Sequence, residues 1–129
     1  MGYCMSMQNC EFLIKKEMIP ALFSKLKEFL STNRLKWVDS RYLEEANNVE
    51  YLFDEIRYDI RRDLDNNIVW IEFFGEKLGD DLRIFQEIAE FVEDGSYIEM
   101  SGEDGCVWRW VFKGGKCDEV FPKIVWESI

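Results

Sequence analysis

A β-hairpin signature near the end of the chain narrows the possible folds more than any other pattern. Residues 97–101 and 107–112 alternate apolar with polar side chains, as strands with one buried face do. Between them lie five residues rich in glycine and acidic side chains. A three-residue loop with Gly105 in the left-handed conformation would close the hairpin by pairing Gly102 with Cys106. Antiparallel strands therefore form at least part of the fold.

The pairing across this hairpin depends on the length of its loop. With three loop residues, unlike charges and apolar side chains both find matching partners across the strands. The expected pairs are Glu99 with Arg109, Met100 with Trp108, and Ile98 with Trp110. A loop one residue longer would place Glu99 opposite Trp108 and lose the charge match. We therefore expect the shorter loop.

Two amphipathic helices are expected. The first has Pro20 in its first turn and ends at residues 31–33. Its apolar side chains are Ile19, Leu22, Phe23, Leu26, Phe29 and Leu30. The second starts after Asp80 or Asp81 and is ended by Gly95 in the left-handed conformation. Its apolar side chains are Leu82, Phe85, Ile88, Ala89 and Val92.

The remaining segments alternate between strands and a helical insert. Further strands are expected at residues 10–14, with an extension back toward Tyr3 as an alternative, and at residues 58–62, 68–74 and 120–126. The insert covers residues 39–57, after an extended piece at residues 35–38. It starts with a short helix capped by Asp39 or Ser40. Its second helix has Asn47 as the cap and Glu50 three residues later, the spacing of a capping box.

This order of elements approaches βαββαβ once the insert is removed. We therefore expect one α+β domain over residues 1–129. Its architecture would be a ferredoxin-like antiparallel sheet with two main helices on one face and a helical insert. With 129 residues, 47% of them hydrophobic, the chain can build a core without disulfides or metals. That fold hosts many unrelated functions and indicates no role by itself.

The chain is strongly acidic, with 26 Asp and Glu against 16 Lys and Arg and a formal net charge of −10. Such a surface repels nucleic-acid phosphates and anionic lipids at long range, and it attracts basic proteins. Solubility alone would also explain this acidity, and it is the simpler explanation.

The charges are distributed unevenly along the chain. Residues 15–41 hold seven basic and three acidic side chains, whereas residues 76–104 hold ten acidic and two basic ones. We therefore expect an acidic ridge on the second helix, continued by acids in the hairpin loop. The candidate partner-binding residues are Glu87, Glu90, Glu93, Asp94, Glu103 and Asp104. A solvated helix face explains them, and a basic groove on a host protein or ribonucleoprotein would explain them equally well.

No catalytic residues are expected. The chain has no histidine, which removes the usual general base near neutral pH and the imidazole metal ligands. No glycine-rich phosphate loop precedes a helix. Glu72 and Glu99 could share an open sheet face with Arg109, but a salt-bridged face is the favoured explanation. We expect neither enzyme activity nor a cofactor.

Four cysteines, Cys4, Cys10, Cys106 and Cys117, form no C-x-x-C pair. A four-thiolate zinc site would require both ends of the chain to meet in one sheet, so we expect buried free thiols and no metal. The chain has neither a signal-peptide pattern nor an apolar run of about 20 residues. We expect a cytoplasmic protein that does not enter a membrane.

Three segments resemble a known group of proteins. They are residues 94–105 (DGSYIEMSGEDG), residues 108–112 (WRWVF) and residues 2–6 (GYCMS). They resemble small, mostly uncharacterised proteins of bacterial phages, prophages and plasmids with a ferredoxin-like fold. The resemblance covers the two ends and the second helix, and residues 33–66 only weakly. It implies an origin in a mobile element and no catalytic residues.

Small acidic phage proteins of this kind resemble inhibitors of host defence, including anti-CRISPR proteins that plug a nucleic-acid channel. We therefore expect a non-enzymatic protein that inhibits a nucleic-acid-handling defence complex through an acidic surface. One alternative is a nucleic-acid-binding regulator that uses the sheet aromatics Trp108, Trp110 and Phe112 and the Lys-rich first helix. Direct nucleic-acid readout is disfavoured because such a stripe fits a core. The other alternative is a small-molecule or nucleotide-signal binder. No pattern sets the oligomeric state.

Overall fold

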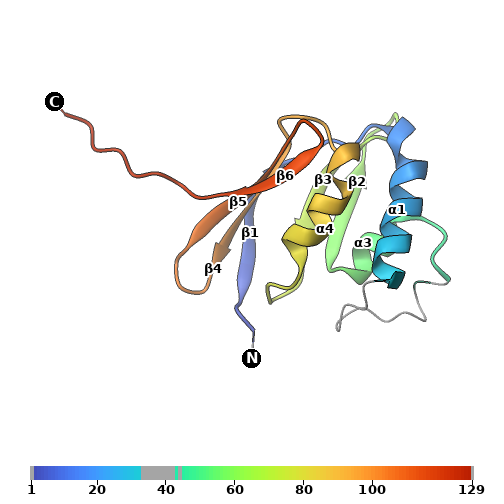
Figure 1. Ribbon diagram of the computed structural model, residues 1–129, viewed down its shortest axis with the longest axis horizontal. Coiled ribbons are helices and arrows are strands. Elements are labelled where there is room, and N and C mark those ends of the chain that lie inside the picture. Colours follow the sequence, from blue (N-terminus) through green and yellow to red (C-terminus); the bar gives the residue numbers. More distant parts are fainter. Residues whose placement is uncertain (1, 33–42, 44, 129) are drawn as a thin grey trace.

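The structure, a computed structural model, describes residues 2–32, 43 and 45–128 (Figure 1). The strands are β1 (Met5–Glu11), β2 (Tyr58–Arg62), β3 (Ile68–Phe73), β4 (Tyr97–Gly102), β5 (Val107–Lys113) and β6 (Lys116–Val120). The helices are α1 (Ile19–Thr32), α3 (Val49–Glu55), α4 (Asp81–Ile88) and the 3-10 turns η1 (Lys16–Met18) and η2 (Ala89–Phe91). The mixed α+β class is confirmed. The extended piece expected at residues 35–38 and the cap at Asp39 or Ser40 lie outside the described residues.

The described strands form two antiparallel sheets. Four strands pair in the order β1-β4-β5-β6, and β2 pairs with β3. The three pairs expected across the β4–β5 hairpin are all present. Gly105 has a φ of 85°, and the Gly102 N–H donates to the Cys106 carbonyl over 2.8 Å. The three-residue loop is therefore confirmed.

The first strand does extend back toward Tyr3: β1 begins at Met5, and it ends at Glu11 and not at residue 14. Its pairing with β4 runs from Met5 opposite Gly102 to Glu11 opposite Tyr97. The register shifts between Met7 and Asn9, as at a β-bulge. Bulges bend a strand and increase its twist. The polar stretch at the bulge obscures the alternation by which a strand is recognised in the sequence.

Strand β1 also runs beside β3, but the segments are joined only by two isolated bridges, one on either side of β1. One bridge joins Ile14 with Ile68, and the other joins Cys4 with Lys77. Between these bridges no ladder pairs the described residues of the two strands. The expected sheet is therefore divided, and a ferredoxin-like arrangement is not confirmed.

Phe85 of α4 ties the two sheets together in one core. Its ring centroid lies 5.2 Å from that of Tyr58 on β2. On its other side it lies 5.4 Å from the ring of Trp110 and 6.0 Å from that of Phe112, both on β5. Helix α1 packs against both α4 and α3. The apolar face expected for α1 is buried, except that Phe23 is only partly buried.

Helix α4 is shorter than the pattern predicts. It ends at Ile88 and passes through η2 to an extended Val92. The Glu93 N–H donates to the Leu13 carbonyl, and the Gly95 N–H donates to the Phe112 carbonyl. These tertiary hydrogen bonds take the place of further helical turns. Gly95 has the expected left-handed conformation, with a φ of 90°, but it leads into β4 and does not end the helix.

Asn48, and not Asn47, caps α3. Its Oδ1 accepts a hydrogen bond from the Tyr51 N–H over 2.8 Å. Glu50 does not complete a capping box, because its carboxylate accepts two hydrogen bonds from Arg62, at 2.6 and 3.0 Å. Either asparagine satisfies the chemistry of a cap, so the choice depends on how the helix meets β2.

The last strand starts earlier than expected. Gly114 and Gly115 have φ values of 61° and 75° and form a two-residue turn. This turn pairs Lys113 with Lys116, so β6 has to begin at Lys116 and not at residue 120.

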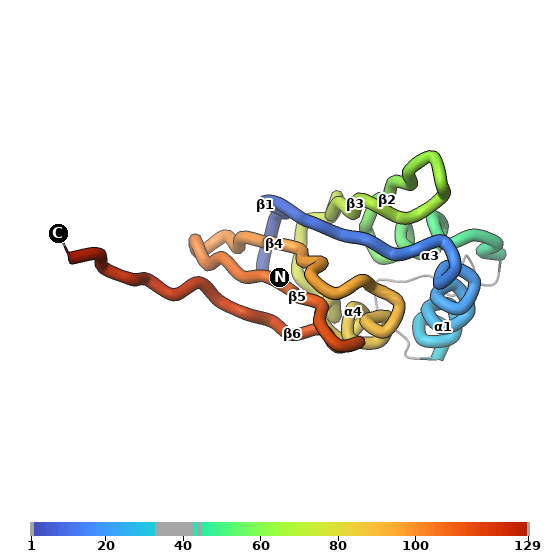
Figure 2. The backbone as a smooth tube through the Cα atoms, turned by 90° about the horizontal axis from the view of Figure 1, so that it is seen from above, coloured from blue at the N-terminus to red at the C-terminus, as the bar shows by residue number. Residues whose placement is uncertain are grey.

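Strand β6 ends because the chain then reaches a proline. Arg109 lies opposite Val120. The same register would place Pro122 opposite Val107, where it has no N–H to donate. Residues 121–128, which we call the arm, have no regular structure and extend away from the body of the molecule (Figure 2).

Candidate functional site

The six acidic residues predicted to bind a partner lie at opposite ends of β4. Glu87 is on α4, Glu90 is in η2, and residues 93–94 are in the segment leading into β4. Residues 103–104 form the hairpin loop after β4. At about 3.4 Å per residue, β4 separates the two groups by roughly 20 Å. The hairpin acids are therefore separate from the predicted ridge, and of the four ridge residues only Glu87 lies on α4, because that helix ends at Ile88.

The two loop acids hold the hairpin against the start of the chain. Glu103 Oε1 accepts a hydrogen bond from the Cys4 N–H over 3.1 Å. Asp104 Oδ1 accepts hydrogen bonds from the Tyr3 hydroxyl and the Cys106 N–H. The Tyr3 hydrogen bond lowers the pKa of Asp104 and raises the pKa of Tyr3 to about 12. These contacts give both acids a structural role.

Three acids of the first group also have partners within the chain. Glu90 forms an ion pair with Lys25, and the resulting hydrogen bond is the main cause of the raised pKa of Lys25. Glu93 lies 3.1 Å from the Lys15 ammonium. Asp94 Oδ1 accepts a hydrogen bond from the Gly114 N–H over 2.9 Å, which supports the turn before β6. Exposed ion pairs contribute little to stability, so Glu90 and Glu93 could exchange these partners for another cation.

A groove runs between α1 and α4 beside this group, with a volume of about 480 Å³. We call it the helix groove. It is lined by Ala21, Ser24, Lys25, Glu28, Phe29, Thr32, Glu87 and Phe91. Phe91 is partly buried and supplies apolar surface, whereas Phe29 is 7% exposed and its ring centroid lies 5.4 Å from the Arg83 guanidinium carbon. Glu28 and Glu87 supply carboxylates, and Lys25 supplies one cation. Lys and Arg side chains combine an apolar stem with a cationic head, so this lining suits them.

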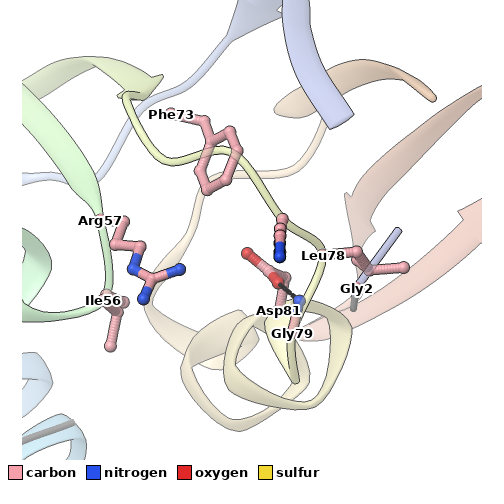
Figure 3. A pocket seen from close by; sticks show the side chains of 8 residues that line it. Gly2, Ile56, Arg57, Phe73, Leu78, Gly79 and Asp81 are labelled. Atoms are coloured by element: carbon pink, nitrogen blue, oxygen red, sulfur yellow. Dashed lines mark hydrogen bonds between the residues drawn. The ribbon is translucent and has the colours of Figure 1, made fainter. Parts of the chain in front are cut away.

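A second cavity, of about 260 Å³, lies at the start of α4 (Figure 3). We call it the α4 pocket. It is lined by Gly2, Ile56, Arg57, Phe73, Lys77, Leu78, Gly79 and Asp81. Figure 3 shows the Arg57 guanidinium and the Asp81 carboxylate directed toward one another across the space. Apolar walls with a few convergent charged groups are typical of small-ligand sites.

Arg57 reaches the α4 pocket from an unusual backbone conformation. Its φ is 70°, which non-glycine residues rarely adopt. Its N–H donates to the Asp54 carbonyl and its own carbonyl accepts from the Phe74 N–H, so both ends of the residue are fixed. Residues held in such conformations cluster at functional sites.

Asp81 forms one wall of the α4 pocket and is 2% exposed. Its Oδ2 accepts a hydrogen bond from the Tyr58 hydroxyl over 2.6 Å, and its Oδ1 accepts one from the Gly79 N–H over 2.8 Å. Burial raises the pKa of Asp81, and the Tyr58 hydrogen bond opposes this effect. Either Asp80 or Asp81 was the expected cap of this helix. Asp80 has the cap position but makes no capping hydrogen bond through its side chain.

The outer face of the four-stranded sheet carries a small polar cluster. Arg109 Nε donates to Glu99 Oε1 over 2.8 Å, and the guanidinium lies 4.2 Å from the Tyr97 ring centroid. The expected salt bridge is therefore confirmed. Glu72 does not join it, because it is on β3, opposite Asp59, in the other sheet.

The aromatics proposed for nucleic-acid binding belong to the core. Trp108, Trp110 and Phe112 are 5%, 0% and 1% exposed, so they offer no stacking surface to bases. The part of that alternative that relied on the sheet aromatics is therefore not supported.

The four cysteines are free thiols, as expected, but only Cys10 and Cys117 are buried. Cys4 is partly buried and Cys106 is exposed. Burial raises the pKa of Cys117 to about 12, with help from Asp118 and Glu119. Within the part of the chain that the structure describes, no three His, Cys, Asp or Glu side chains gather as metal ligands. The same residues contain no helix that combines the length and apolar character needed to span a bilayer.

Of the predicted partner-binding residues, Glu87 lines the helix groove, and their binding role stays a prediction. No pattern in the sequence predicts the α4 pocket. Arg57 and Lys77 are isolated basic residues in connecting segments, and neither belongs to a motif. Asp81 was expected only as a helix cap, and its burial depends on Tyr58 from another sheet.

Comparison with known proteins leaves these sites without a precedent: no family model, no curated protein and no solved structure matches the chain.

Proposed function

We propose that the chain is a non-enzymatic binding protein that captures a basic segment of a macromolecular partner in the helix groove. The observation that carries this proposal is the lining of the groove, where Phe29 and Phe91 lie beside the carboxylates of Glu28 and Glu87. The formal net charge of −10 adds long-range attraction toward a basic partner and raises the rate of encounter.

The partner we propose is a host protein or ribonucleoprotein that handles nucleic acid, as in a CRISPR defence complex. Such proteins present basic channels to phosphates, and a rigid acidic protein can occupy the same channel. Cytoplasmic action in the host bacterium follows from this proposal. The support is the charge of the chain together with its resemblance to small phage proteins.

We also propose that the architecture is a ferredoxin-like arrangement with an opened ladder. The two isolated bridges place β3 beside β1, and β4 pairs with the other edge of β1. The resulting order, β2-β3-β1-β4, interleaves two βαβ units, as in the split βαβ fold. Strands β5 and β6 then extend the sheet.

The groove is tested with charge reversal and a defined probe. A fluorescent peptide of alternating Arg and Ala, titrated by anisotropy at low salt, should bind the native chain. Glu87→Lys should weaken this binding at least roughly fivefold, because it replaces attraction in the groove with repulsion. Glu72→Lys is the matched control, since it makes the same charge change at an exposed position of β3, away from the groove.

Equal weakening by both variants would show that only net charge matters and would contradict a groove site. Amide shifts in an NMR titration give a second readout. They should be concentrated at Ser24, Glu87 and Phe91 rather than at the hairpin loop.

The α4 pocket supports a second function, the binding of a small anion. Two cations, Arg57 and Lys77, line the pocket. Inorganic phosphate, titrated by calorimetry, should bind saturably, and Lys77→Gln should abolish the binding. Lys16→Gln is the matched control on the exposed η1. Phosphate binding that is unchanged in Lys77→Gln would rule this function out.

A further inference from the structure

The arm exposes an unusual concentration of large apolar side chains. Phe121 is 61% exposed, Ile124 80%, Val125 74% and Trp126 90%. Contiguous apolar surface of this kind marks an interaction site. The arm leaves the body directly after β6, so its position relative to that strand limits what it can pair with (Figures 1 and 2).

In the described sheet β6 pairs with β5 alone, so no strand covers its other edge, although α4 contacts β6 and the Gln86 side chain donates a hydrogen bond to the Cys117 carbonyl over 3.5 Å. The turn-closing pair Lys113–Lys116 fixes which residues bond to β5. Lys116, Asp118 and Val120 direct their backbone groups toward β5. The residues between them, Cys117 and Glu119, therefore direct theirs outward, and Phe121 would follow the same alternation. A free edge with open N–H and C=O groups is a template for another strand.

Pro122 ends the pairing with β5 but does not block the free edge. Backbone groups of successive residues point alternately toward β5 and toward the free edge. Pro122, like Lys116 and Val120, has its backbone nitrogen on the β5 side, so the N–H that proline lacks is not missed at the free edge. The outward edge can therefore continue from β6 into the arm. Within sheets, proline is confined to positions of this kind.

We propose that two copies of this chain pair antiparallel along these edges, so that the arm of each copy lies along β6 of the other. The charge pattern selects the register. With Phe121 on the two-fold axis, Glu119 of one copy lies opposite Lys123 of the other. Cys117 lies opposite Val125, and Lys116 lies opposite Trp126, where an ammonium can rest on the ring.

Neighbouring registers are disfavoured by like charges. Moving the axis to residue 119 sets Glu119 against Glu119, and moving it to residue 123 sets Lys123 against Lys123. Like charges directly opposite one another are destabilising. An axis at residue 125 pairs only the arms and leaves β6 uncovered. The register through Phe121 covers the free edge and the arm together in an isologous interface.

The register is tested by cross-linking in a Cys106→Ser background, because Cys106 is exposed. Directly opposed residues in a hydrogen-bonded antiparallel pair have Cα atoms about 5.5 Å apart, within the range of a disulfide. Phe121→Cys should therefore form a disulfide-linked dimer under mild oxidation. Lys123→Cys, the matched control in the arm, faces Glu119 and should not. Equal cross-linking of the two variants would overturn the register.

The dimer itself is tested by sedimentation of the full native chain. It should sediment as a dimer, whereas a variant that stops after Val120 should be a folded monomer by circular dichroism and sedimentation. Lys123→Glu sets two pairs of like charges opposite one another and should weaken dimerisation at least roughly fivefold. A native chain that remains monomeric at 100 µM would overturn the proposal.

Discussion

At the scale of single residues, the buried carboxylate of Asp81 has the largest consequence. Its oxygens accept hydrogen bonds from Tyr58 on β2 and from the Gly79 N–H, so it joins the start of α4 to the two-stranded sheet. Burial raises the pKa of the Tyr58 hydroxyl well above its ordinary value, which keeps the hydroxyl protonated as the donor. A buried charge is tolerated when its hydrogen bonds are made.

Tyr58→Phe should remove about 1–3 kcal/mol from the free energy of unfolding at pH 7, because it leaves a buried carboxylate oxygen without a donor. The pKa of Asp81 is raised in the folded state, so its contribution to stability is fully present below the unfolded pKa and is lost as the pH rises through the folded pKa. The penalty of Tyr58→Phe should therefore grow from acidic to neutral pH.

Urea unfolding at a series of pH values measures this trend. Tyr97→Phe, on the outer sheet face, is the control and should change stability by less than about 0.5 kcal/mol. A penalty that does not vary with pH would show that Asp81 is not the group involved. The stability contributed by Glu50 changes with pH in the opposite direction. The hydrogen bond from Arg62 lowers the pKa of Glu50, so its contribution is present at neutral pH and is lost in acid.

At the scale of elements, the ends of helices and strands depend on tertiary contacts more than their centres do. The β4–β5 register follows the sequence because its loop and cross-strand pairs are within fifteen or so residues of one another. Helix α4 ends early because the Glu93 N–H donates to the carbonyl of Leu13, just after β1, and the Gly95 N–H donates to the carbonyl of Phe112 on β5. Helix α3 starts one residue later than its sequence predicts, again because of a tertiary contact. Arg62 on β2 binds the Glu50 carboxylate, which therefore does not complete the predicted capping box.

The cap of α3 gives a prediction with a matched neighbour. Asn48→Ala should lower the free energy of unfolding by about 1 kcal/mol, because the Tyr51 N–H loses its acceptor. Asn47→Ala should change it by less than about 0.5 kcal/mol, since both asparagines are exposed and only Asn48 caps the helix. Thermal or urea unfolding compares the two. A larger effect at Asn47 would contradict the assigned cap.

At the scale of the whole molecule, the charges are distributed differently in space than in the sequence. The acidic block at residues 76–104 is divided by β4 into two groups, and ion pairs to Lys15 and Lys25 join the basic early segment to the acidic later one. Within the described residues, the surfaces for which we propose a partner are the helix groove, the α4 pocket and the arm. The arm lies furthest from the core, and both proposed binding sites involve α4.

The sequence by itself determined the α+β class, the amphipathic helix α1, the strands β2 and β3 and the complete register of the β4–β5 hairpin. All of these depend on periodicity or turn chemistry between residues close along the chain. Only the tertiary structure decided that the sheet divides beside β1, that Asp81 is buried by Tyr58, and that Arg57 and Lys77 line one cavity. These features bring together segments that are distant in sequence, where packing and backbone hydrogen bonds outweigh local preference and leave no pattern in the chain to mark them.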